Sequence, residues 1–179
     1  MVVSKATTPR RSLSAVATSS LTTTEENRKL FTQRKVYSED VSSAPAIEWA
    51  ELRSLARDAT NRSYAPYSRV TVGAGALRDD GTTVVGSNVE NASYGLTLCA
   101  ECSLVSDHIR RGGGRLVAVS IVAGDGKPIS PCGRCRQLLF EHGGPGLLID
   151  AGDGVAPLRL DELLPDAFGP EELGIRRNP

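Results

Sequence analysis

The sequence predicts an α/β fold in which helices pack on a mixed β-sheet. In the second half of the chain, segments with helical periodicity alternate with apolar, β-branched segments, an order typical of strands joined by crossover helices. In the first half, the Asp-Gly turn in residues 78–81 joins two strands as an antiparallel hairpin. The 179 residues are enough for one domain with a proper core.

Each element has its own signal in the sequence. The first helix is expected within residues 47–63, where Trp49, Leu52, Ala56 and Ala59 recur at steps of three and four. Hydrophobic alternation, β-branched runs and glycine stops then predict a turn at 64–68, strands at 70–77 and 82–91, a helix at 99–111, a strand at 115–123, a helix at 132–142, a strand at 146–150 and a short helix within 160–168.

The first 46 residues differ from the rest in composition. Residues 1–24 contain 11 Ser/Thr, three basic residues and no acidic residue. Such a segment has little apolar surface to offset the entropy of ordering, so residues 1–46 are predicted to be a disordered extension and residues 47–179 the folded domain. A transit peptide shares this composition and is a second interpretation.

Charge and cysteine content limit the class of protein. Lys+Arg and Asp+Glu both number 21, which gives no electrostatic reason to expect a nucleic acid or an anionic membrane as partner. No apolar run approaches the roughly 20 residues that span a bilayer. Four cysteines in two close pairs, with no secretory signal before them, indicate metal ligands in a cytoplasmic protein.

The cysteines form the pattern C-x2-C twice, as Cys99 with Cys102 and Cys132 with Cys135. In one interpretation all four hold a structural zinc ion, and Glu101 is an ordinary solvated residue. The spacer of 29 residues between the pairs is longer than the roughly 15–20 residues of a zinc ribbon, which weakens this interpretation.

In the other interpretation only Cys99, Cys132 and Cys135 bind zinc, and the fourth position stays open for water. Cys99 and Cys132 begin predicted helices, whose N-termini favour thiolate over thiol. Glu101 lies in the first turn beside Cys99, where one carboxylate could accept the proton of the water and later donate it. This arrangement suits hydrolytic deamination.

Four segments, in order, are similar to the cytidine deaminase family: YAPYSRVTVGAGAL (64–77), GSNVENASYGLTLCAEC (86–102), SPCGRCRQLLFEHGG (130–144) and LLPDAFG (163–169). The C-x-E…P-C-x-x-C pattern is the signature of zinc deaminases. The resemblance runs almost without a break from Trp49 to Phe168. It implies a three-layer α/β/α cytidine-deaminase-like fold with a mixed sheet of about five strands. A cysteine as the first ligand resembles the free-nucleoside branch, and Cys102 resembles actinobacterial members.

The resemblance also implies a role for each matching residue. Glu101 would be the proton shuttle, and Cys99, Cys132 and Cys135 would bind one Zn²⁺ per subunit. Residues implied to bind the substrate are Asn88 and Glu90 at the ribose, Ala92, Ala100 and Ser130 through backbone groups at the base and amine, and Tyr94 and Phe168 at the pocket of a neighbouring subunit.

Two positions depart from the family pattern. Many members carry an arginine after the catalytic glutamate, and its charge offsets the thiolates; here Cys102 stands in its place. The sequence suggests Arg136 or the two helix N-termini as substitutes. Val70 stands where a pocket phenylalanine is usual, which should loosen contact with the base.

The resulting expectation is a zinc-dependent deaminase that converts cytidine and 2′-deoxycytidine to uridine and 2′-deoxyuridine in pyrimidine salvage. The resemblance implies a homotetramer, with a nucleoside as the small-molecule partner and neither nucleic acid nor membrane. Two alternatives stay open: a blasticidin-type aminonucleoside deaminase and a non-catalytic module that mediates interactions and is held together by a four-cysteine structural zinc site.

Overall fold

The computed structural model describes residues 45–170, 172 and 173 of the chain. The elements are, in order, α2 (Trp49–Thr60), β1 (Val72–Arg78), β2 (Thr83–Ser87), the 3₁₀ turn η2 (Tyr94–Leu96), α3 (Ala100–Arg110), β3 (Leu116–Ala123), α4 (Gly133–Gly143), β4 (Leu148–Ile149), β5 (Leu158–Arg159) and α5 (Leu160–Leu163). Within these ranges no helix has the length and apolar character that would let it cross a membrane.

Five strands of the described chain form one mixed sheet in the order β2-β1-β3-β4-β5. The central pairs β1–β2 and β1–β3 are antiparallel, β3–β4 is parallel, and β4–β5 is antiparallel. A parallel pair needs a crossover connection, which α4 supplies between β3 and β4. The mixed sheet and the α/β class predicted from the sequence are therefore confirmed.

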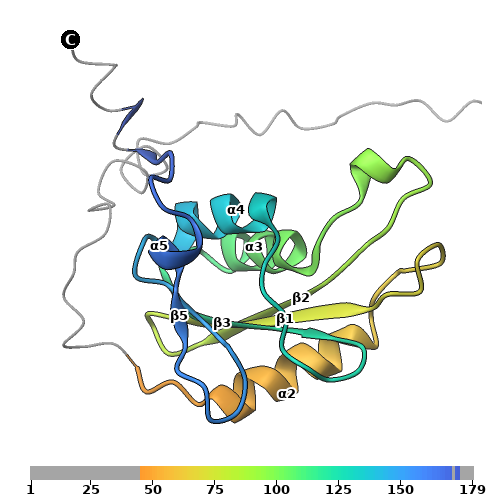
Figure 1. The fold of residues 1–179 in the computed structure, drawn as a ribbon, viewed down its shortest axis with the longest axis horizontal. Coiled ribbons are helices and arrows are strands. Elements are labelled where there is room, and N and C mark those ends of the chain that lie inside the picture. The colour runs from red at the N-terminus through yellow and green to blue at the C-terminus, as the bar shows by residue number, and fades with distance from the viewer. Residues whose placement is uncertain (1–44, 171, 174–179) are drawn as a thin grey trace, which may run out of the picture. The chain divides into compact units, whose positions relative to one another are not determined.

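The helices cover both faces of the sheet, as Figure 1 shows, with α2 on one face and α3 and α4 on the other. The two faces have separate clusters of buried apolar side chains. The α2 face buries Leu52, Leu77 and Ala118, with Trp49 and Leu55 packed against them. The other face buries a larger set: Ala74, Ala76, Val84, Ala100, Leu104, Val105, Leu116, Val119, Ile121, Leu139, Leu147, Ile149 and Leu160. Because β1 alternates its side chains between these clusters, it is buried along nearly all of its length.

Glycine allows two of the helices to lie directly on the sheet. A Cβ atom at Gly73 would lie 1.9 Å from the carbonyl oxygen of Ala56 in α2. A Cβ atom at Gly86 would lie 2.2 Å from the backbone nitrogen of Leu104 in α3. Both contacts are with backbone, which cannot rotate away, so a side chain at either position would push a helix off the sheet. Gly86 therefore fixes the depth of α3, whose N-terminus carries Glu101.

A buried ion pair joins Arg53 of α2 to Asp150, the residue that follows β4. The Asp150 carboxylate accepts hydrogen bonds from Arg53 Nε at 2.7 Å and Nη2 at 2.8 Å, and from Ser120 Oγ at 2.7 Å. Burial raises the pKa of Asp150, but the hydrogen bonds from Arg53, the Gly152 amide and Ser120 outweigh it and leave the pKa below its usual value. With its side chain only 2% exposed, Asp150 stays ionised because it is fully partnered.

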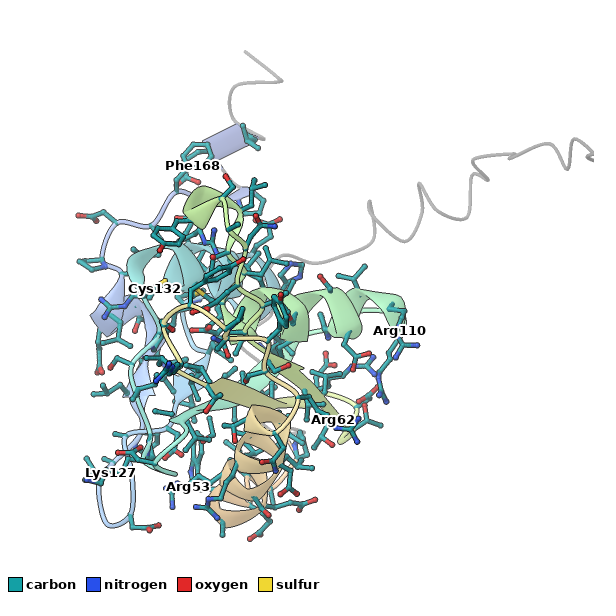
Figure 2. All side chains as sticks on the ribbon, turned by 90° about the vertical axis from the view of Figure 1, so that its right-hand side faces the viewer. Arg53, Arg62, Arg110, Lys127, Cys132 and Phe168 are labelled. Carbon is teal, nitrogen blue, oxygen red and sulfur yellow. The ribbon has the colours of Figure 1, made fainter. Side chains whose placement is uncertain are left out.

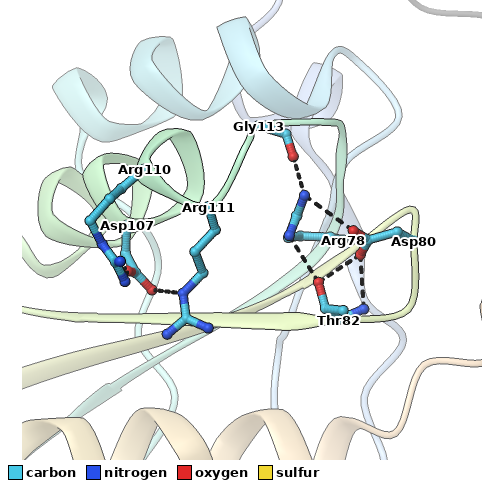
Figure 3. A network of polar contacts seen from close by, with 7 residues as sticks. All are labelled: Arg78, Asp80, Thr82, Asp107, Arg110, Arg111 and Gly113. Carbon is cyan, nitrogen blue, oxygen red and sulfur yellow. Dashed lines mark hydrogen bonds and ion pairs between the residues drawn. The ribbon is translucent and has the colours of Figure 1, made fainter.

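A second polar network closes the end of the sheet away from this pair (Figure 3). Arg78, at the end of β1, donates to the Gly113 carbonyl and to Thr82 Oγ1, and forms an ion pair with Asp80 at 3.1 Å. Gly113 belongs to the connection between α3 and β3, so this arginine ties that connection to the hairpin. The last turn of α3 is held nearby by Asp107, which pairs with Arg110 and Arg111.

The structure refines several predicted boundaries. β2 ends at Ser87 rather than near residue 91, because from Val89 the chain pairs with two loops instead of with β1, as described below. The helix predicted within 160–168 covers only Leu160–Leu163; Pro165 follows closely, and the residue before a proline disfavours helical geometry. The two-residue strand β5 was not located from the sequence. The predicted extension 1–46 lies outside the described residues except for Pro45 and Ala46, and stays a prediction.

Candidate functional site

Two helix N-termini and two loops meet beside the sheet to form the site. Cys99 is the N-cap of α3 and Cys132 the N-cap of α4, and both have extended backbone dihedrals. The chain reaches Cys132 because the turn after β3 folds back and Ile129 donates its backbone N–H to the Ile121 carbonyl at 2.9 Å. Figure 2 shows Cys132 on the same side of the molecule as Phe168, with Arg53 and Lys127 at the opposite end.

The sulfur atoms of Cys99, Cys132 and Cys135, here called the cysteine triad, all lie within 4.8 Å of one another. The Cys99 and Cys132 sulfurs are 3.9 Å apart. Zinc–sulfur bonds of about 2.3 Å in a tetrahedral arrangement place two sulfurs roughly 3.8 Å apart, whereas a disulfide needs about 2.05 Å. The triad therefore fits three ligands of one zinc ion, and tetrahedral zinc then has one position left.

Cys102 does not belong to the triad. Its side chain leaves α3 one turn after Cys99, and its sulfur lies 3.5 Å from Nη2 of Arg134. The group of potential metal ligands found among the described residues contains Cys99, Cys132 and Cys135 without it. This geometry favours the open three-thiolate site over the four-thiolate structural site.

Glu101 is buried in the first turn of α3, with 4% of its surface exposed. Burial raises the pKa of its carboxyl group, while a hydrogen bond with Cys135 and the charge of Arg134 partly oppose that shift. A solvated helix residue would show neither the burial nor the contact with a triad cysteine. The carboxyl group therefore lies against the triad, with its pKa moved toward the range in which a group can both accept and donate a proton.

Segment 88–90 runs between two other segments and lies next to the triad. The Asn88 carbonyl accepts from the Tyr64 N–H at 3.0 Å, and the Glu90 N–H donates to the Tyr64 carbonyl at 2.8 Å. On its other side, Val89 exchanges two backbone hydrogen bonds of 2.9 Å with Leu98. Because Leu98 precedes Cys99, this double pairing brings both predicted ribose-binding residues near the start of α3.

The two predicted ribose-binding side chains are held by their surroundings. Asn88 Oδ1 accepts from the Val72 N–H at 2.8 Å and Nδ2 donates to the Val70 carbonyl at 2.9 Å, which leaves each atom one further hydrogen bond to make. The Glu90 carboxylate accepts from the Ser68 hydroxyl and from the backbone N–H groups of Tyr67 and Ser68. The Ser68 hydrogen bond and the two N–H groups lower the pKa of Glu90, so it is an anion at neutral pH.

The other predicted site residues lie in α3, in the 3₁₀ turn η2 or in loops. Ala100 is buried as the first residue of α3, while Ala92 and Ser130 are exposed in loops. Tyr94 is 77% exposed and packs edge-on against Tyr67, with ring centroids 6.3 Å apart. Phe168 is half exposed, and its carbonyl accepts a 2.7 Å hydrogen bond from Gln137 of α4.

Sequence reasoning named the wrong arginine as a contact for the thiolates. Arg136 donates to the carbonyls of Pro131 at 2.9 Å and Leu163 at 2.8 Å, which holds its guanidinium at the α4–α5 junction. Arg134 instead lies 3.7 Å from the Cys99 sulfur and 3.5 Å from that of Cys102. Ser68, which holds Glu90, was also missed.

The chain matches the family model for the cytidine and deoxycytidylate deaminase zinc-binding region over residues 48–149, more than half of its length. A cytidine deaminase from Mycobacterium tuberculosis is 57% identical over 129 residues, which are 72% of this chain and 96% of that protein. The crystal structure of cytidine deaminase from the same organism superposes with a TM-score of 0.67 at 57% identity, covering 69% of this chain and 99% of that one. The Mycobacterium leprae cytidine deaminase structure gives a TM-score of 0.65 at 50% identity, covering 68% of this chain and 100% of that one.

The fold, the triad and the buried carboxyl group are thus those of a zinc-dependent hydrolase that removes an amino group. The chain belongs to the cytidine and deoxycytidylate deaminase family. The predicted family, its actinobacterial character and the three-layer deaminase fold are confirmed, and the cysteine triad is assigned as the ligand set of one Zn²⁺ per chain.

Proposed function

We propose that the chain hydrolytically deaminates cytidine and 2′-deoxycytidine to uridine and 2′-deoxyuridine, releasing ammonia, and that it serves pyrimidine salvage. The observation that carries the proposal is a buried carboxyl group, Glu101, against three sulfurs that fit one zinc ion. A site with three protein ligands and a neighbouring acid–base group is the arrangement of hydrolytic zinc enzymes rather than of structural zinc sites.

The chain's own groups account for the proton transfers of this reaction. Zinc, when bound, supplies a Lewis acid that lowers the pKa of a water molecule toward about 7. Glu101 would accept a proton from that water molecule while the water oxygen attacks C4 of the base. Glu101 would then deliver this proton to N3. Finally, Glu101 would take the proton of the hydroxyl group formed at C4 and give it to the amino group, so that ammonia leaves as the C4 carbonyl forms. One carboxyl group suffices because each proton that it gives is one that it has taken.

Backbone groups around the triad are suited to orient the base. Ala100 is the first residue of α3, so its N–H has no partner within the helix and would donate to the substrate. The Ser130 carbonyl, two residues before Cys132, would accept a hydrogen bond from the departing amine, and the exposed backbone of Ala92 would contact the pyrimidine. These contacts would hold the amino-bearing carbon next to Glu101.

Asn88 and Glu90 would select a nucleoside. The amide has one donor and one acceptor position remaining, and the anionic carboxylate accepts from hydroxyl groups. The same carboxylate would repel a 5′-phosphate, so cytidine monophosphate should be a poor substrate.

The substrate class is tested with the wild-type protein and Glu90→Gln. Wild-type protein should deaminate cytidine and deoxycytidine, followed by the fall in ultraviolet absorbance and by ammonia release, and should leave cytidine monophosphate and blasticidin S almost unchanged. Glu90→Gln should raise KM for cytidine about tenfold or more, since hydrogen bonds to a charged group are worth roughly 1.5–3 kcal/mol. Glu51→Gln, the same change at an exposed residue of α2, should have no effect. Faster turnover of blasticidin S than of cytidine would contradict the proposal.

A homotetramer with active sites shared between subunits is also proposed. Several large apolar side chains around the site are exposed in the single chain: Tyr64, Tyr67, Val70, Val89, Tyr94, Leu96, Leu98, Ile129 and Phe168. Tyr94 at 77% and Leu96 at 65% exposure are unusual for side chains of this size, and a cluster of this kind is typical of an interaction surface.

Light scattering should give four times the mass of one chain. Tyr94→Ala should both lower this mass or weaken the assembly on dilution and raise KM for cytidine, because Tyr94 would line the pocket of a neighbouring subunit. Val155→Ala removes another exposed apolar side chain, from the loop between β4 and β5, and should change neither quantity. A wild-type protein that scatters as a monomer at full activity would rule out shared sites.

A cytoplasmic location and a catalytic domain over residues 47–179 complete the proposal. None of the four described cysteines forms a disulfide, and a reducing compartment keeps thiols available as metal ligands. The residues assigned to the site fall between Tyr64 and Phe168, within the proposed domain.

A further inference from the structure

The triad leaves the site with excess negative charge. Three thiolates around a divalent cation sum to one negative charge, and Glu101 adds another when it is ionised. The triad lies at the N-termini of α3 and α4, where the helix dipoles supply some positive potential. Each helix end acts as only about half a charge, however, and more electron-rich sulfurs reduce the Lewis acidity of the metal that they bind.

Arg134 places a full positive charge at this position. It lies in the first turn of α4, between Cys132 and Cys135, and its Nη2 reaches across to the first turn of α3. There Nη2 lies 3.0 Å from the Thr97 carbonyl, 3.7 Å from the Cys99 sulfur and 3.5 Å from the Cys102 sulfur. One guanidinium nitrogen thus contacts a proposed zinc ligand, the neighbouring thiol and the loop that leads into α3.

Arg136 shows that this orientation is specific to Arg134. The two residues are separated by one position and so project from the helix about 200° apart. Arg136 donates to the carbonyls of Pro131 and Leu163, away from the sulfurs. Of these two arginines, only Arg134 directs its charge at the triad.

We propose that Arg134 is a positioning residue that tunes the zinc site, by placing its charge and an N–H donor against the Cys99 thiolate while Cys102 and Thr97 hold the guanidinium in place. The proposal rests on the proposed function for its effect on catalysis, but its effect on the metal requires only that the triad binds one. A donor against a thiolate withdraws electron density from the sulfur. The metal then remains a stronger Lewis acid, and the nucleophilic water remains easier to deprotonate.

Replacing Arg134 with Ala should therefore weaken the chemical step more than substrate binding. We expect kcat for cytidine to fall about tenfold or more with KM changed less than about threefold, in line with the 10- to 100-fold effects of residues that contact metal ligands. In cobalt(II)-substituted protein, the sulfur-to-cobalt charge-transfer band should move to longer wavelength, because a thiolate without its donor gives up an electron more easily.

Two closer variants separate charge from simple attachment. Arg134→Gln keeps a donor for the Thr97 carbonyl but has no charge, and should shift the band and lower kcat nearly as much as Ala. Arg134→Lys keeps the charge and should stay near the wild type in both measurements. Arg110→Ala, which removes an exposed arginine at the far end of α3, is the matched control and should change neither.

A band that stays at its wild-type wavelength in the Gln variant would mean that Arg134 only ties two segments together, and would overturn the proposal. A Lys variant whose charge-transfer band is shifted as far as that of the Ala variant would overturn the proposal as well. If the wild-type protein fails to deaminate cytidine, the proposed function is lost, yet the band positions of the cobalt proteins still decide the role of Arg134.

Discussion

Replacing Glu101 with Gln should lower kcat for cytidine by a factor of about 10³–10⁴ while zinc content and thermal stability stay near wild type, since positioned acid–base groups contribute roughly 10²–10⁴-fold and this one would serve two transfers. The amide has the volume of the carboxyl group that it replaces, so the packing of the buried side chain is kept. What it lacks is the capacity to take a proton from water and pass it to the base. The measurements are steady-state kinetics with cytidine and metal analysis of the same sample.

The control for this prediction is Glu51→Gln, an identical change at an exposed residue of α2, which should leave all three quantities unchanged. A Glu101→Gln protein that retains zinc and still turns over cytidine at more than about a tenth of the wild-type rate would contradict the assignment of Glu101 as proton carrier. Loss of zinc together with activity would instead indicate that Glu101 supports the metal.

Replacing Cys132 with Ala should lower zinc affinity by roughly a hundredfold to a thousandfold, since one of about four ligands accounts for about a quarter of the 10–16 kcal/mol of a structural zinc site. Deamination should disappear with the metal. The Cys132 sulfur lies 3.9 Å from that of Cys99, and no other sulfur of the described chain is positioned to replace it in the triad. Zinc per chain after dialysis against a chelator is the direct measurement, with activity as the second.

Cys102→Ala is the matched comparison, because it removes a thiol from the same C-x2-C pattern that lies outside the triad. This variant should retain one zinc per chain through the dialysis that empties Cys132→Ala. Loss of zinc from both variants would show that Cys102 is a fourth ligand. The site would then be the four-cysteine structural zinc site, which the sequence alone did not exclude.

Long elements with a strong pattern were predictable from the sequence. The apolar steps of three and four in residues 49–59 identify α2, and the β-branched run in residues 115–123 identifies β3, which is buried along most of its length. β5 was not predictable, because two residues, Leu158 and Arg159, are too few to show a period of two. It forms because β4 offers an edge to pair with, and that partnership arises only in the folded chain.

Residue types and spacing predicted much of the site, but not the directions of its side chains. The spacing made Cys102 as suitable a ligand as Cys99, since residues three apart share a helix face. Cys132 and Cys135 have the same spacing and both belong to the triad, so spacing alone does not separate Cys102 from the ligands. The choice between Arg134 and Arg136 likewise depends on where α4 lies relative to α3, which packing across the sheet decides.

The position of β3 between the triad cysteines has a consequence for how the protein acquires its metal. Cys99 and Cys132 lie on opposite sides of β3 in the chain, and their sulfurs meet only after β3 has paired with β1 and the turn after it has folded back. A chain without that central pairing holds Cys99 apart from Cys132 and Cys135, so no local segment carries all three ligands. Tight metal uptake must therefore follow the completion of the sheet, and release of the ion should report opening of the molecule's centre rather than fraying at its edges.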